Sequence, residues 1–118
     1  MTIEPTSYRD WTEAYRCTVG SLELIAVTSM GPRILSLRFS GGENLLYEDP
    51  THFGVGAWRL YGGHRFTVAP ESAASYAPDN VPCEVDTRED RLRICAPTAE
   101  GLLRAFEIIP CPCGAGFT

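Results

Sequence analysis

Apolar and polar residues alternate with a period of two along much of this sequence of 118 residues. Residues 21–28 place Leu22, Leu24 and Ala26 on one face. Residues 33–40 repeat the pattern with Leu35, Leu37 and Phe39. Because successive side chains of a strand point to opposite faces, this spacing predicts two strands. The Gly31-Pro32 pair between them is typical of a turn, so we expect antiparallel neighbours.

The second half of the chain continues the same pattern. We expect three further strands, over residues 82–87, 91–97 and 102–109. Within them, Leu92, Ile94 and Ala96 form an apolar stripe. Only residues 6–15 hint at a helix, and they lack an apolar stripe of period 3.6. No repeat or linker divides the chain, so the sequence predicts one all-β unit of antiparallel strands over residues 1–118.

The charge balance excludes some classes of partner. All ten positive charges are arginine, and fifteen acidic residues give a net charge of -5 and a pI near 4.9. Phosphate binding needs clustered cations, but these arginines are spread from Arg9 to Arg104, so we expect no nucleic-acid partner. No apolar run approaches the roughly 20 residues of a membrane span, and the N-terminus lacks an export signal. We therefore expect a cytoplasmic protein without a membrane partner.

Five cysteines occur in the sequence, at positions 17, 83, 95, 111 and 113. An odd number without an export signal argues against a disulfide framework, so we expect free and mostly buried thiols. Cys111-Pro112-Cys113 suggests a metal site, but zinc sites usually space paired cysteines further apart and need a second pair. No signature of a catalytic cysteine surrounds any thiol. We expect neither a metal nor a cofactor.

The stretch from residue 58 to residue 71 differs from the alternating segments. It holds the five residues that we expect to bind a substrate, namely Trp58, Arg59, His64, Arg65 and Glu71. Gly62-Gly63 allows positive φ angles or a close backbone approach, which could present His64 and Arg65 at the end of a strand. Arginine and histidine supply donors for hydroxyl oxygens, and Trp58 or Tyr61 could lie against a sugar face.

Four of these five residues also have a structural interpretation. His64 could hold the backbone by a hydrogen bond, and Arg65 could form a salt bridge with Glu71. Glu71 could instead belong to a turn after Ala69-Pro70. Arg59 could be a solvated surface residue. By composition alone, residues 76–80 form a turn-rich loop.

In their order along the chain, several short motifs resemble the N-terminal half of galactose-mutarotase-like, or aldose 1-epimerase-like, proteins. The motifs are Gly31-Pro32-Arg33-Ile34-Leu35-Ser36-Leu37, Asn44-Leu45-Leu46-Tyr47, Trp58-Arg59-Leu60-Tyr61-Gly62-Gly63-His64-Arg65, Ala69-Pro70-Glu71 and Tyr76-Ala77-Pro78-Asp79-Asn80. The resemblance covers most of residues 15–110, and residues 58–71 are its most specific block.

The resemblance implies an antiparallel β-sandwich, part of a so-called supersandwich, that binds a monosaccharide or a sugar-like ligand. The implied reaction is the interconversion of sugar anomers. In such enzymes a glutamate takes the proton of the anomeric hydroxyl and a histidine protonates the ring oxygen. His64 and Arg65 match the substrate-binding region of the family, and Glu71 lies nearby. The general base and the principal acid normally come from the second half of that domain.

The resemblance also leads us to expect a truncated domain that is inactive alone. A sandwich without its later strands would expose strand edges, through which the chain could associate with itself. Two other functions stay open, a noncatalytic carbohydrate-binding module and a structural β-domain.

Overall fold

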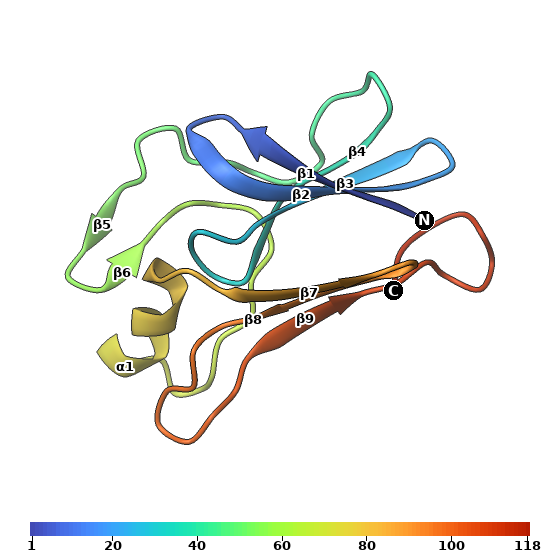
Figure 1. Cartoon of the computed structure of the whole chain (residues 1–118). Coiled ribbons are helices and arrows are strands. Elements are labelled where there is room, and N and C mark those ends of the chain that lie inside the picture. The colour runs from blue at the N-terminus through green and yellow to red at the C-terminus, as the bar shows by residue number, and fades with distance from the viewer.

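The computed structural model describes residues 1–118, which form two antiparallel sheets lying one above the other in Figure 1. The first sheet has the strand order β1 (Thr2–Tyr8), β2 (Trp11–Val19), β3 (Leu22–Val27) and β4 (Arg33–Phe39). The second sheet has the order β7 (Glu84–Arg88), β8 (Arg91–Cys95) and β9 (Ala105–Ile108). A short ribbon follows the first sheet along the chain, with strands β5 (Gly54–Val55) and β6 (Trp58–Arg59). The predicted all-β antiparallel sandwich is confirmed.

The two sheets share one apolar core, which follows from the alternation in the sequence. Leu24 and Ala26 of β3 face the second sheet, where Leu92 and Ile94 of β8 meet them. Ile94 is fully buried. Burying an aliphatic side chain of this size contributes about 1.5–3 kcal/mol to folding. The prediction that Leu24 shares a face with Ala26, and Leu92 with Ile94, is therefore confirmed.

The opposite face of the first sheet is apolar as well. It carries a second cluster of buried residues, which consists of Ala14, Ile25, Val27, Met30 and Leu35. The side chains of Tyr8, Trp11 and Tyr61 pack against this cluster and cover it. Tyr61 comes from the long segment after β4, so this segment folds back over the outer face of the sheet. The candidate site described below lies on this face.

A β-bulge in β4 overturns the predicted faces of that strand. Ile25 pairs with Ser36 and Ala26 pairs with Ile34, so Leu35 is an extra residue without a partner in β3. An extra residue shifts the alternation by one position. Ile34 therefore packs with Leu37 against the inter-sheet core, while Leu35 joins the cluster on the outer face. The prediction that Leu35 and Leu37 share a face was wrong.

The side chain of Asn44 supports the edge of β4 at this bulge. Its amide oxygen accepts hydrogen bonds from the backbone N–H groups of Leu37 at 3.0 Å and Leu46 at 3.1 Å. Its amide nitrogen donates to the backbone oxygen of Leu35 at 2.9 Å. One side chain thus satisfies backbone groups that a neighbouring strand would otherwise pair.

The helical hint over residues 6–15 was wrong, because this segment forms an antiparallel hairpin. Tyr8 of β1 pairs with Trp11 of β2, and Arg9 takes a positive φ of 52° in the turn between them. The pairing continues from Thr6 opposite Ala14 toward the N-terminus. Pairing across the hairpin, with β3 on the other side of β2, outweighs a weak local preference for helix.

The only helical segments are short, and the second of them lies within the predicted turn-rich loop. Helix α1 (Ala73–Tyr76) is followed directly by the 3-10 helix η1 (Ala77–Asn80). Ser72 and Ser75 form a capping box at the start of α1, in which each serine side chain bonds the backbone of the other. Neither segment has the length and apolar character needed to cross a membrane.

Candidate functional site

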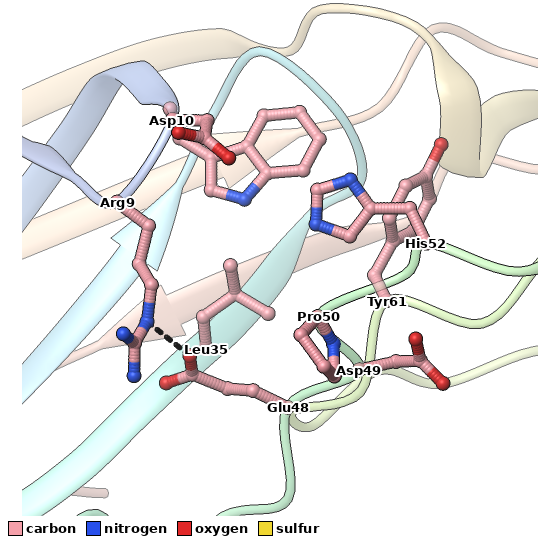
Figure 2. A pocket seen from close by; sticks show the side chains of 9 residues that line it. Arg9, Asp10, Leu35, Glu48, Asp49, Pro50, His52 and Tyr61 are labelled. Atoms are coloured by element: carbon pink, nitrogen blue, oxygen red, sulfur yellow. Dashed lines mark hydrogen bonds and ion pairs between the residues drawn. The ribbon is translucent and has the colours of Figure 1, made fainter.

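A pocket of about 330 Å³ lies on the outer face of the first sheet (Figure 2). The β1–β2 turn supplies Arg9 and Asp10, and Trp11 begins β2. The segment after β4 supplies the opposite wall. The complete lining consists of Arg9, Asp10, Trp11, Leu35, Glu48, Asp49, Pro50, His52 and Tyr61. Aromatic, cationic and acidic side chains thus meet in one hollow.

Three rings form an aromatic wall in this pocket. The rings of Trp11 and His52 are stacked, with centroids 5.3 Å apart and an interplanar angle of 27°. Tyr61 meets both edge-on, at 5.6 Å from Trp11 and 5.7 Å from His52. Such pairs are favourable beyond the area that they bury, so the rings hold one another in place. His52 itself has a positive φ of 49°, in the left-handed region.

Glu48 provides a fixed carboxylate in the pocket. It accepts hydrogen bonds from the Tyr8 hydroxyl, from Arg9 Nε at 2.7 Å and from Asn44 Nδ2 at 2.6 Å; Figure 2 draws the contact with Arg9. Burial raises the pKa of Glu48, but these hydrogen bonds outweigh burial and hold the pKa below its usual range. Glu48 is therefore ionised at neutral pH. Asn44 links it to the bulged edge of β4.

Asp49 is a second carboxylate in the lining, and its side chain points away from that of Glu48 (Figure 2). Its carboxylate accepts hydrogen bonds from the hydroxyl and the backbone N–H of Thr51, the latter at 2.7 Å, and these bonds lower the pKa of Asp49. Ionised carboxylates accept hydrogen bonds from ligand hydroxyls, and aromatic rings offer flat apolar surfaces. The pocket therefore combines hydrogen-bond acceptors with flat apolar surfaces.

The five residues predicted to bind substrate lie outside this pocket. His64 is exposed, and its ring centroid is 5.4 Å from that of Phe106 in β9. Its backbone pairs with Ile34 of β4, with N–O distances of 2.7 and 3.0 Å. Arg59 donates hydrogen bonds to two nearby carbonyl oxygens. Trp58 packs edge-on against Phe53 at 5.8 Å.

Arg65 and Glu71 are the two predicted residues whose side chains form a polar contact. Their closest charged atoms are 3.8 Å apart, as expected for the structural salt bridge. A stronger contact joins Arg65 Nη1 to Asp79 Oδ2 at 2.8 Å. Glu71 also accepts a hydrogen bond from the Tyr76 hydroxyl, and the guanidinium of Arg65 lies over the ring of Tyr76. These contacts tie the Arg65 segment to α1 and η1.

Asp79 is the centre of a buried arginine cluster. Besides Arg65, it contacts Arg104 Nη1 at 3.3 Å and Arg33 Nη2 at 4.0 Å. Arg33 is 3% exposed and Arg104 is 5% exposed. Burial lowers the pKa of Arg33 to about 10, although the charge of Asp79 acts in the opposite direction. Through the carboxylate of Asp79, the arginine cluster joins β4, the segment after β6 and the residue before β9.

Sequence reasoning singled out Tyr61 but missed most of the pocket. His52 lies in the glycine-rich and aromatic region after residue 49, which was a usable signal. The sequence contains no comparable signal for Trp11 and Glu48. These two residues come together only because the β1–β2 hairpin forms and the segment after β4 folds over the sheet. No group of three or more histidine, cysteine, aspartate or glutamate side chains could hold a metal ion.

Comparison with known proteins identifies no relative of this chain. No protein-family model, no curated protein and no solved structure matches the chain. The function proposed below therefore depends on the geometry and chemistry of the pocket.

Proposed function

We propose that the chain binds a monosaccharide, or a similarly hydroxyl-rich small molecule, in the pocket of Figure 2. The observation that carries this proposal is the stacked pair of Trp11 and His52 lying in the same hollow as the ionised Glu48. A sugar presents one face of C–H groups and a rim of hydroxyls. The aromatic rings can pack against the C–H face, and the carboxylates can accept hydrogen bonds from the hydroxyls.

The pocket also has a suitable size and preorganisation. Its volume of about 330 Å³ lies at the lower end of the roughly 300–1,000 Å³ found for small-molecule sites. Glu48 is held by three donors from separate parts of the first sheet and its loops. A ligand would therefore meet an acceptor that is already oriented, which lowers the entropy lost on binding.

Anomer interconversion is a second candidate, favoured by the presence of both His52 and Glu48 in one pocket. The reaction needs a base for the anomeric hydroxyl proton and an acid for the ring oxygen. Glu48 would act as the base and His52 as the acid. However, the lowered pKa of Glu48 makes it a weak base, so binding alone is the better-supported function.

The binding proposal is tested by titrating a panel of hexoses while recording tryptophan fluorescence. The chain has two tryptophans, of which Trp11 lines the pocket and Trp58 does not. In the Trp58→Phe variant, the signal should persist because Trp11 reports the ligand. Glu48→Gln should then weaken binding about tenfold, equal to roughly 1.4 kcal/mol.

Trp11→Phe is the matched control, and it should abolish the fluorescence response. Absence of a response to every hexose in the Trp58→Phe protein would contradict the binding proposal. Polarimetry on a freshly dissolved sugar anomer distinguishes anomer interconversion from binding alone. An enzyme must accelerate the approach to equilibrium over buffer, and His52→Ala must remove that acceleration.

A further inference from the structure

The last ten residues form a hairpin loop that carries two neighbouring thiols. Ile109 and Thr118 exchange backbone hydrogen bonds of 2.8 and 2.9 Å, and the N–H of Cys111 donates to the oxygen of Gly116 at 2.7 Å. This loop is the red segment beyond β9 in Figure 1. Cys113, at its tip, is exposed. The pocket does not include this loop, so the proposed function leaves it unexplained.

The loop brings the two sulfur atoms together. The Sγ atoms of Cys113 and Cys111 are in direct contact and share a hydrogen bond. The backbone N–H of Cys113 also points to Cys111 Sγ, at 3.4 Å. Gly114 takes a φ of 74°, and its N–H donates to the oxygen of Cys111 at 2.8 Å, which closes the turn around both thiols. Both cysteines are free, so the pair is a dithiol.

The other three thiols are differently placed. Cys17 and Cys95 are buried, and Cys83 is half-buried. Burial raises the pKa of Cys17 to about 11 and that of Cys83 to about 12. By contrast, the side-chain hydrogen bond shared with Cys111, together with backbone N–H groups of the turn, lowers the pKa of Cys113. Because the thiolate is the reactive form, an oxidant in solution should meet Cys113 first.

We propose that Cys111 and Cys113 form a redox-active dithiol, which a low-molecular-weight disulfide such as oxidised glutathione converts to an intramolecular disulfide. The thiolate of Cys113 attacks one sulfur of the oxidant, which forms a mixed disulfide and releases one glutathione thiolate. Cys111 then loses its proton and attacks Cys113 Sγ, which releases the second glutathione. The dithiol is oxidised by two electrons, and one molecule of oxidant is reduced to two thiols.

The experiment follows the thiols of the reduced, folded protein after exposure to oxidised glutathione. Unreacted thiols are alkylated after denaturation, and the protein is cleaved with trypsin. Arg104 is the last arginine, so residues 105–118 form a single peptide that contains Cys111 and Cys113 and no other cysteine. We expect this peptide to escape alkylation and to lack two hydrogen atoms. The peptides that contain Cys17, Cys83 and Cys95 should be alkylated.

Two single variants test the order of the steps. In Cys111→Ser the reaction should stop at a mixed disulfide between Cys113 and glutathione. Cys113→Ser should react much more slowly, because the remaining thiol of Cys111 is less exposed. The proposal is overturned if residues 105–118 of the native protein are alkylated at both cysteines, or if a stable mixed disulfide accumulates there. Thermal melts of both variants check that the fold is intact.

Discussion

Replacement of Asp79 by asparagine should destabilise the protein severely. Asp79 is 5% exposed, and its carboxylate faces Arg65 at 2.8 Å, Arg104 at 3.3 Å and Arg33 at 4.0 Å. Asparagine preserves the shape but removes the only carboxylate that contacts Arg33 and Arg104. Loss of one partner from a buried ion pair costs about 3–5 kcal/mol, because the remaining charge stays buried.

This loss is large relative to the stability of such a domain. At about 0.05–0.15 kcal/mol per residue, a chain of this length has a free energy of unfolding of roughly 6–18 kcal/mol. The assay is urea unfolding at neutral pH. With a slope of about 2 kcal/mol per molar urea, the midpoint of Asp79→Asn should fall by roughly 2 M.

Asp86→Asn is the matched control for this measurement. Asp86 also contacts two arginines, Arg88 at 3.3 Å and Arg91 at 3.0 Å, but it is exposed. Exposed ion pairs contribute at most about 1 kcal/mol, so its urea midpoint should move little. Equal midpoints for Asp79→Asn and Asp86→Asn would refute the reasoning that burial makes the arginine cluster dependent on its carboxylate.

Three further outcomes are expected. Ile94→Ala should lower the free energy of unfolding by about 2–5 kcal/mol in urea titrations, because Ile94 is fully buried between the sheets. Gly63→Ala should lower the melting temperature more than Gly41→Ala. Both glycines have positive φ, which costs about 1–2 kcal/mol for alanine, but a Cβ at Gly63 would also lie 2.3 Å from a carbonyl oxygen of β4. Finally, urea midpoints should fall as the pH rises from about 9 to about 11. The folded state keeps the thiols of Cys17 and Cys83 protonated, since burial raises their pKa from 9.0 to about 11 and about 12, while the unfolded chain releases these protons. Cys17→Ala should make this decline shallower, and an unchanged decline would contradict the assignment.

The strands that alternate without interruption could be predicted from the sequence. Leu24 and Ala26, for example, face the second sheet as their spacing predicts. The faces of β4 could not be predicted in this way, because the bulge at Leu35 shifts the alternation. The bulged edge of β4 is supported by the side chain of Asn44, nine residues along the chain, and periodicity contains no information about such a contact.

The candidate site was less accessible to sequence reasoning than the fold. The Gly-Gly-His-Arg block attracted attention because of its composition, yet Arg65 is turned toward Asp79 and His64 toward Phe106. The pocket depends on tertiary structure, since Trp11 and Glu48 are far apart in the sequence. They line one pocket only because the segment after β4 folds across the first sheet.

Because of the strand order, the arginine cluster links two sheets that can each form separately. Every ladder in both sheets joins strands that are neighbours in sequence, so each sheet can form from local contacts. A chain cut between residues 70 and 71 would leave each sheet on its own fragment. Asp79 would then belong to one fragment, while Arg33 and Arg65 would belong to the other. When such fragments recombine, opposite charges would select the docking register, and apolar burial would supply the free energy.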